Sequence, residues 1–224
     1  MPQPIAKRCV AEALGTFFLL AAVVGSGIMA ERLANGDTAL ALLANTVATG
    51  AALVALIISF AAVSGAHFNP VVTLSFALSR DLAWRDTPVY LLAQLAGGIA
   101  GVMAANMMFG LQAVLVSQHP RTGVAQVFSE FVATFGLLSV ILGSSRFHVA
   151  VVAIAVGAYI SAAYWFTAST SFANPAVTVG RCLSDTFAGI RPADAPWFIV
   201  AQLAGGIAAT FLFRWLMRGG EDES

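Results

Sequence analysis

The chain alternates between long apolar runs and short polar connections. A helix that spans a membrane needs about 20 mostly apolar residues, and six runs meet that length, at roughly 9–29, 39–62, 87–110, 125–144, 147–167 and 195–216. Two more apolar segments, 66–79 and 171–184, are too short to span, and each contains Asn-Pro. Proline is tolerated at the start of a helix and breaks its interior. The pattern therefore predicts six full spans and two half-length helices.

Composition supports a membrane location. Hydrophobic residues make up 59% of the chain and charged residues 10%, whereas soluble domains have about 45–50% and about 25%. The first apolar run follows Lys7 and Arg8, but no small-residue cleavage site closes it, so we expect a retained helix. Zero net charge gives no indication of nucleic-acid binding. Cys9 and Cys182 are too few for a disulfide framework or a metal site, and we expect no metal and no cofactor.

Internal repeats divide the chain into two related halves. Residues 11–17 are echoed at 129–135, residues 69–73 at 174–178, and residues 93–100 recur letter for letter at 201–208. Three spans per half is an odd number, so the second half must enter the membrane from the opposite side. Such inverted repeats place a functional site near the midplane. We expect one all-α domain, 1–224, with halves of about 1–115 and 120–218.

Basic residues predict the orientation. Seven would lie on the side of the termini, namely Lys7, Arg8, Arg80, Arg85, Arg146, Arg214 and Arg218, and four on the opposite side, namely Arg32, Arg121, Arg181 and Arg191. Cytoplasmic loops carry the excess of Lys and Arg. We therefore expect a multi-pass protein of the inner (plasma) membrane with both termini in the cytoplasm.

The two Asn-Pro pairs predict the central chemistry. Asparagine is a favourable N-cap and proline a favourable first helical residue, so Asn69 and Asn174 should begin short helices. By symmetry these helix starts meet at mid-membrane, where their partial positive charges repel cations. Both asparagine amides would stay free to donate to a passing oxygen. Two helices that merely dip into the bilayer are the alternative, but two copies at matched repeat positions favour a conduit for neutral molecules.

These motifs closely resemble the twin Asn-Pro-Ala signatures of aquaporins and aquaglyceroporins. The resemblance rests on residues 64–73 and 172–176 and covers nearly the whole chain. It implies a right-handed bundle of six helices with two re-entrant half-helices, a pore in each subunit and a homotetramer in the lipid bilayer. It also implies a central constriction formed by Asn69, Pro70, Val71, Asn174, Pro175 and Ala176.

Buried carboxylates and glycines have structural interpretations. Glu12 and Glu130 lie inside apolar spans, where a charge costs about 2.5–3.5 kcal/mol or more. They are either structural or part of a proton relay; the resemblance implies that they accept hydrogen bonds from the re-entrant loops, and we favour this role. His67 is expected to brace the first loop. Small residues on the third and sixth spans predict close helix packing: Gly97, Gly98, Gly101, Gly205 and Gly206.

The chain departs from the family pattern at the outer selectivity filter. Val177 stands where most aquaporins have arginine, and Thr49 stands where water-selective members have an aromatic residue. A straight count along the fifth span gives Ala162 as its filter residue, while a different alignment gives Tyr164. With Ser171 from the loop, these residues describe a wide constriction of weak polarity.

Two further departures carry expectations. Val71 replaces the first signature's alanine and should slightly crowd the midplane. Arg181 lies one helical turn beyond Val177, and helical side chains lean toward the helix N-terminus. Arg181 could therefore reach back and partly replace the missing filter arginine; the alternative is an arginine at the headgroup level.

We predict a passive channel for small neutral solutes: glycerol, urea, water and neutral metalloid hydroxides such as arsenite, with methylated arsenicals also able to fit. The form Asn-Pro-Ala-Val resembles a bacterial subgroup of aquaglyceroporins associated with arsenic resistance. Alternatives are a water-selective aquaporin, an ion-coupled transporter and a membrane scaffold that conducts nothing. An enzyme is not expected, because no nucleophile, base or metal cluster is present.

Overall fold

The computed structural model describes residues 3–217, and within them every regular element is a helix. The helices are α1 (Ile5–Leu33), α2 (Thr38–Ser64), α3 (Pro70–Leu78), α4 (Thr87–Met108), α5 (Val124–Ser144), α6 (Val149–Phe166), α7 (Pro175–Arg181) and α8 (Ala195–Leu216). Six of them are long and apolar enough to cross a membrane, which confirms the predicted spans. Arg218, which contributed to the predicted orientation, lies outside the described residues.

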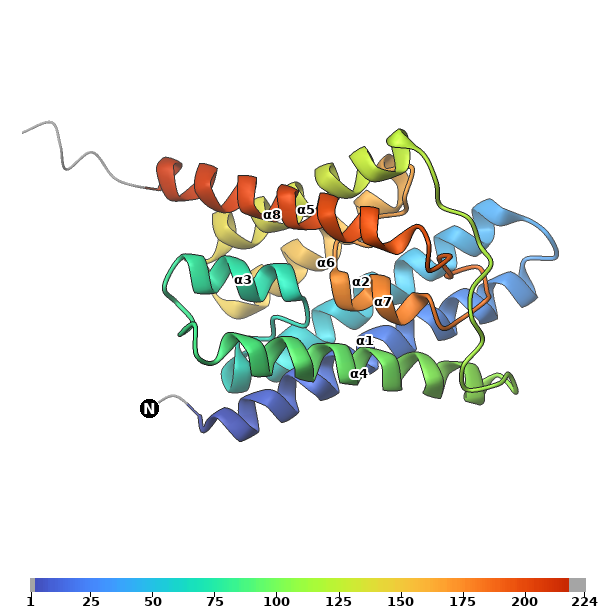
Figure 1. Ribbon diagram of the computed structural model, residues 1–224, viewed down its shortest axis with the longest axis horizontal. Coiled ribbons are helices and arrows are strands. Elements are labelled where there is room, and N and C mark those ends of the chain that lie inside the picture. The colour runs from blue at the N-terminus through green and yellow to red at the C-terminus, as the bar shows by residue number, and fades with distance from the viewer. Residues whose placement is uncertain (1–2, 218–224) are drawn as a thin grey trace, which may run out of the picture.

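The two half-length helices lie between the long ones (Figure 1). At 1.5 Å per residue, α3 is about 14 Å long and α7 about 10 Å, so neither can cross a hydrocarbon core of about 30 Å. Each begins at the proline of an Asn-Pro pair. Their N-termini face each other in the middle of the molecule, and each helix runs outward toward one end (Figure 1).

The long helices pack in two matched sets. In the first half α1 packs against α2 and α4, and in the second half α5 packs against α6 and α8. Helices α2 and α6 join the halves. The contacts of α1 with α4 and of α5 with α8 are close because glycines face a backbone: a methyl group added at Gly97 or Gly101 would overlap carbonyl oxygens of α1, and one at Gly205 would overlap a carbonyl of α5. Small residues allow such approach between membrane helices.

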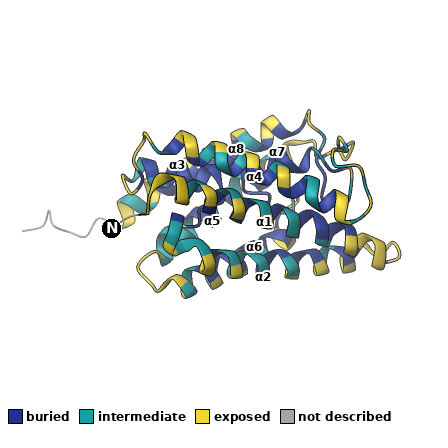
Figure 2. Cartoon of the chain, turned by 90° about the horizontal axis from the view of Figure 1, so that it is seen from below, coloured by how far each residue is buried: buried dark blue, intermediate teal, exposed yellow. Residues whose placement is uncertain are grey.

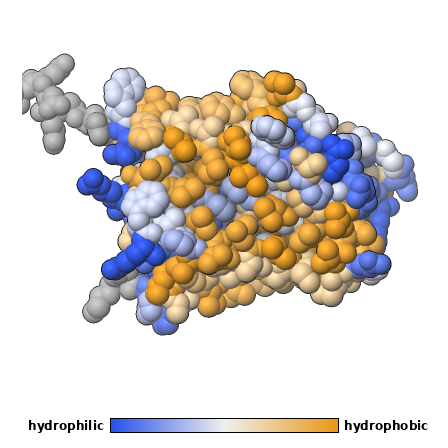
Figure 3. Space-filling view, viewed as in Figure 1, coloured by the Kyte–Doolittle hydropathy of each residue, from blue (hydrophilic) through white to orange (hydrophobic). Residues whose placement is uncertain are grey.

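The outer surface suits a bilayer. Buried residues face the interior of the bundle, whereas exposed residues face outward and cover the ends (Figure 2). Many exposed side chains on the outward faces of the long helices are large and apolar, among them Phe18, Leu92, Phe128, Ile154 and Phe211. The face in Figure 3 has a broad hydrophobic middle with hydrophilic side chains at both ends. The chain is therefore a multi-pass membrane protein, as predicted.

Neighbouring glycines on α4 allow a matched test of this packing. Gly97→Ala should destabilise the protein by about 1–3 kcal/mol, because the methyl group meets the Ala13 backbone, which cannot move aside like a flexible side chain. Gly98→Ala should be neutral or slightly stabilising, since the nearest atom, Thr16 Cγ2, lies 3.4 Å away and alanine favours the helix. Thermal unfolding of the purified variants in detergent measures the difference. Equal midpoints would contradict a close α1–α4 contact.

Candidate functional site

The loops that precede the half-helices have an unusual backbone. Ala66 and Phe68 in the first loop have φ of 53° and 48°, and Ser171 and Ala173 in the second have φ of 50° and 49°. These values lie in the left-handed region, which residues other than glycine rarely adopt. Each costs about 1–3 kcal/mol and persists only where its surroundings hold it. The loops therefore need strong anchors.

Glu12 of α1 anchors the first loop. Its Oε1 accepts hydrogen bonds from the His67 backbone N–H at 3.0 Å and the Ser64 hydroxyl at 2.6 Å. Its Oε2 accepts from the Phe68 backbone N–H and the Gln94 side-chain amide, both at 2.7 Å. The carboxylate is fully buried, and four donors offset the cost of that burial.

Glu130 of α5 has the same role in the second half. It is also fully buried, and it accepts from the backbone N–H groups of Phe172 at 2.9 Å and Ala173 at 2.8 Å. The Gln202 side chain donates to it at 2.6 Å. Neither Glu12 nor Glu130 is among the residues that line the central cavity described below. This geometry favours structural support over the alternative of a proton relay.

Two crossed hydrogen bonds join the loops at the centre. Asn69 Nδ2 donates to the Ala173 carbonyl and Asn174 Nδ2 donates to the Phe68 carbonyl, each at 2.8 Å. The Asn69 Oδ1 caps α3 by accepting from the Val71 N–H at 2.9 Å. The expectation that both amides are free is therefore wrong in part: each donates one of its two hydrogens across the midplane, and the other remains for a solute.

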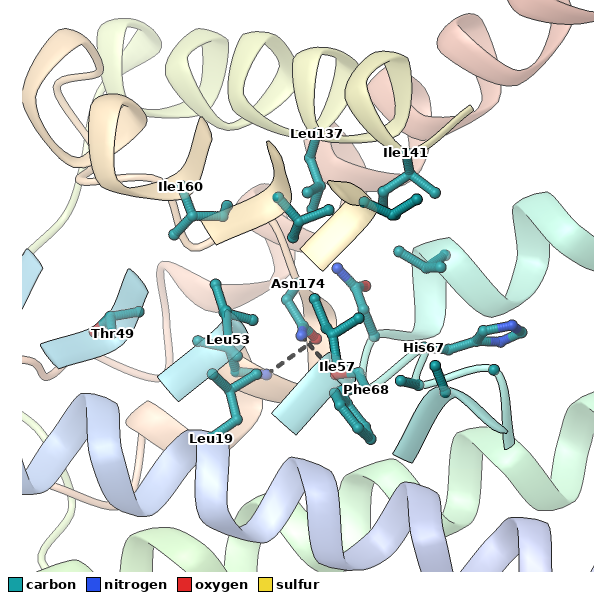
Figure 4. Close-up of a pocket in the computed structure, with 18 of the residues that line it drawn as sticks. Leu19, Thr49, Leu53, Ile57, His67, Phe68, Leu137, Ile141, Ile160 and Asn174 are labelled. Atoms are coloured by element: carbon teal, nitrogen blue, oxygen red, sulfur yellow. Dashed lines mark hydrogen bonds between the residues drawn. The ribbon is translucent and has the colours of Figure 1, made fainter. Parts of the chain in front are cut away.

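Asn69 and Asn174 border a cavity of about 300 Å³ that runs between the halves (Figure 4). Thr49 lies on one side of Asn174 and His67 on the other (Figure 4). Much of the lining is aliphatic and comes from α1, α2, α5 and α6, with Leu19, Val23, Leu53, Ile57, Leu137, Ile141, Val156 and Ile160. The polar groups that line the cavity come mainly from the two loops before the half-helices and from the end of the cavity near Thr49. The cavity thus combines a largely aliphatic lining with a smaller number of hydrogen-bonding groups.

The structure places Tyr164, and not Ala162, on the cavity. Ala162 is exposed on the outside of α6 and does not line the cavity, whereas Tyr164 is buried and lines it. Residues two positions apart in a helix differ by about 200° around its axis. The straight count therefore reached a residue on the opposite face of α6. The Tyr164 hydroxyl lies 3.2 Å from the Thr49 hydroxyl. Ser171, in the loop that follows α6, and Val177, in α7, also line the cavity.

Four residues of the Asn-Pro motifs do not line the cavity: Pro70, Val71, Pro175 and Ala176. The prediction that Val71 crowds the midplane is therefore wrong. Val71 points toward α8, where its Cγ1 atom fills the space that a Cβ of Gly206 would occupy. The extra bulk of valine is accommodated by glycine on the neighbouring helix. Of the predicted central constriction, only the two asparagines reach the cavity.

His67 lines the cavity on the side away from Thr49. Its Nδ1 lies 3.1 Å from the Thr73 hydroxyl of α3. Its ring packs near the rings of Phe76 and Tyr90, with centroids 4.6 Å and 5.4 Å away. These contacts brace the first loop against α3 and α4.

Arg181 is one of two buried arginines near the Thr49 end of the cavity. It is 2% exposed and lines the cavity, so its side chain points into the bundle. Its guanidinium carbon lies 3.4 Å from the centroid of the Phe172 ring. Its Nε donates to the Ala188 carbonyl.

Arg121, which the sequence indicated only as a basic loop residue, is the second. It is 9% exposed, and its guanidinium carbon lies 4.9 Å from the same Phe172 centroid. Its Nε donates to the Gly189 carbonyl at 2.8 Å and its Nη1 to the Ser169 carbonyl at 3.1 Å. Burial lowers the pKa of Arg121 to about 10, so it stays charged at neutral pH. It lies in a long loop with no periodic pattern, and no sequence signal places it here.

Among the described residues, no group of three or more His, Cys, Asp or Glu side chains could hold a metal ion. The residues that line the cavity offer hydrogen bonds, charge and shape. Asn69 and Asn174 supply donors at the centre. Arg181, Ser171 and Tyr164 supply polar groups at one end.

Comparison with known proteins gives consistent matches. The family model described as "Major intrinsic protein" matches residues 2–148 and 143–223. The chain is 56% identical over 214 residues to Aquaglyceroporin AqpS of Rhizobium meliloti, covering 96% of this chain and 91% of that protein. It is 34% identical to Aquaporin NIP1-4 of Oryza sativa, covering 96% and 78% respectively. The solved aquaglyceroporin of Plasmodium falciparum has the same fold, with a TM-score of 0.75 at 21% identity and 95% of both chains covered.

The anchoring role of Glu12 can be tested with one substitution. Glu12→Gln should destabilise the protein by about 3 kcal/mol or more, because an amide group would face N–H donors that now meet a buried carboxylate oxygen. Glu31→Gln on the same helix is the control. That carboxylate is exposed and accepts one hydrogen bond, from Phe187, so we expect a change within about 0.5 kcal/mol. Thermal unfolding in detergent separates the two, and similar losses would refute the anchor.

Proposed function

Because the chain belongs to the major intrinsic protein family, we propose that it is a passive channel for small neutral solutes, with a wide outer constriction of weak polarity. Members of this family are passive channels and not enzymes. The observation that supports the proposal best is the cavity itself. Its lining is largely aliphatic with a few polar groups, an arrangement suited to solutes that carry hydroxyl groups on a small carbon or metalloid centre.

The width of the constriction follows from the residues at the Thr49 end. Val177 stands where most members of the family have arginine, which removes a fixed charge, several donors and much bulk. Thr49 is small, and its hydroxyl lies 3.2 Å from the Tyr164 hydroxyl. Ser171 adds a hydroxyl. We propose Thr49, Tyr164, Ser171 and Val177 as the outer selectivity filter, and Asn69 with Asn174 as the central constriction.

Glycerol is the first candidate solute, since a curated relative with 56% identity is called an aquaglyceroporin. Urea, water and neutral metalloid hydroxides such as arsenite are of comparable or smaller size and bear oxygen or nitrogen hydrogen-bonding groups. Methylated arsenicals would place methyl groups against the aliphatic wall. Arg181, close to the filter, is proposed as a partial substitute for the missing filter arginine.

The alternatives fit the site less well. A water-selective aquaporin needs a narrow filter, and Thr49 with Val177 makes a wider one. An ion-coupled transporter needs titratable groups on the path, and Glu12 and Glu130 are bound to loop backbones away from the cavity. A scaffold without transport does not account for a cavity that is open between polar groups.

We further propose that the chain is a single channel domain over 1–224 and assembles as a homotetramer, with a pore in each subunit. By the count of Lys and Arg residues, it lies in the inner (plasma) membrane with both termini in the cytoplasm.

Solute uptake into proteoliposomes by stopped flow tests the function. The wild type should pass water, glycerol, urea and arsenite well above protein-free liposomes. Val177→Arg should lower glycerol and arsenite permeability by about tenfold or more, which corresponds to a barrier higher by about 1.4 kcal/mol. Water, being smaller, should be affected less. If neither glycerol nor arsenite passes the wild type, the wide-filter proposal fails.

A second pair of variants tests which residue of α6 belongs to the filter. Tyr164→Ala should raise the permeability of polyols larger than glycerol, such as erythritol, because it removes a ring that lines the cavity. Ala162→Leu should leave permeability at the wild-type value, because Ala162 is exposed on the outside of the helix. The same stopped-flow assay measures both. The opposite pattern, with an effect only at position 162, would reject Tyr164.

A further inference from the structure

Two guanidinium groups converge on one aromatic ring near the proposed filter. The guanidinium carbons of Arg181 and Arg121 lie 3.4 Å and 4.9 Å from the centroid of Phe172. All three side chains are buried, with exposures of 2%, 9% and 4%. The π face of Phe172 offsets part of this charge. The outer end of the cavity therefore carries two positive charges within a short distance.

No carboxylate in the described part of the chain forms an ion pair with either arginine. Arg121 instead donates to backbone carbonyls of Ser169, Phe187 and Gly189. Glu130 accepts from the loop backbone and Gln202, and Asp194 accepts from the backbone N–H of Arg121 at 2.9 Å, not from its guanidinium. Buried charges are normally paired, whereas in the described structure both guanidinium groups hydrogen-bond to backbone carbonyls, lie near the Phe172 ring and form no ion pair.

Donors at the same place lack partners. Arginine has five N–H donors, and the only hydrogen bond of the Arg181 side chain within residues 3–217 runs from Nε to the Ala188 carbonyl. The Ser171 hydroxyl is buried, lines the cavity and has no hydrogen-bond partner in the described structure. An unpaired buried hydroxyl such as that of Ser171 is costly unless something binds it. Arg181 and Ser171 line the same cavity, at the end where Arg121 adds its charge.

We infer that Arg181 and Ser171, with Arg121 behind Phe172, form a binding subsite for a small monovalent oxyanion at the outer end of the channel. A planar anion matches the guanidinium fork, and hydrogen bonds to a charged acceptor are about twice as strong as neutral ones. The inference rests on the proposed function, because the bound anion would occupy the path of neutral solutes.

The anion should bind without passing. Beyond this end the lining is largely aliphatic, with residues such as Leu53, Ile57 and Ile160, and an ion stripped of water there is strongly disfavoured. At the centre, each asparagine has one hydrogen left to offer. A small oxyanion is therefore expected to compete with glycerol and to act as a reversible blocker of neutral-solute flow.

Nitrate is a suitable probe, since it is small, planar and charged at any working pH. In proteoliposomes, nitrate should lower wild-type glycerol permeability in a saturable manner, while the bulky carboxylate gluconate at equal ionic strength should not. Arg181→Gln and Ser171→Ala should each weaken the inhibition, and Arg121→Gln should weaken it less. Arg32→Gln is the matched control, because this arginine is exposed at the end of α1 and donates to the Phe109 carbonyl. The neighbouring Glu31 accepts from the Phe187 backbone N–H.

Calorimetric titration of the detergent-purified protein with nitrate gives a readout that does not depend on flux. Arg181→Gln should raise the dissociation constant about tenfold or more, which is about 1.4 kcal/mol. Ser171→Ala guards against a folding artefact, because its hydroxyl has no partner to lose. Wild-type binding in both variants, or equal effects of nitrate and gluconate on the wild type, would overturn the subsite. Arg181-dependent binding without glycerol flux would instead refute only the proposed function.

Discussion

The structure depends on pairing the backbone of two loops in a place that bulk water does not reach. A chain that enters the bilayer, turns and leaves exposes N–H and C=O groups, and at membrane depth these must be satisfied within the protein. Glu12 and Glu130 accept the N–H groups, and the crossed amides of Asn69 and Asn174 take one carbonyl from each loop. Because each asparagine binds the opposite loop, neither half can form its loop correctly alone.

The same pairing explains why half-helices are used. A continuous helix satisfies its own backbone and has no polar atoms left for a solute. Stopping at Asn-Pro frees carbonyls and amide hydrogens at mid-membrane, and the strain at Phe68 and Ala173 turns these groups toward one another. The aliphatic residues of α2 and α6 then need only determine how wide the cavity is. On the proposed function, the paired loops set the polar path and the aliphatic lining sets which solutes fit.

Much of the fold could be predicted from the sequence, because hydrophobic length and repeated motifs are local signals. The six spans and both half-helices follow from runs of apolar residues and from Asn-Pro. Side-chain directions were harder. Ala162 and Tyr164 are two residues apart and face opposite ways, and counting from Asn174 cannot resolve a loop of altered length. The Val71 side chain packs into the space left by Gly206 on α8, a contact between segments far apart in the sequence. Arg121 reaches the site through a long irregular loop, whose path no periodicity encodes.

The position of positive charge links width to selectivity on the proposed function. An arginine at position 177 would narrow the filter and repel cations with one group. Here Val177 does not narrow the filter as an arginine would. Arg181 and Arg121 still place positive charge beside the path, and the Arg181 guanidinium lies over the Phe172 ring. Coulomb repulsion falls only as the inverse of distance, whereas steric exclusion ends at contact. A guanidinium moved one helical turn away therefore still opposes cations but no longer blocks a wide neutral solute.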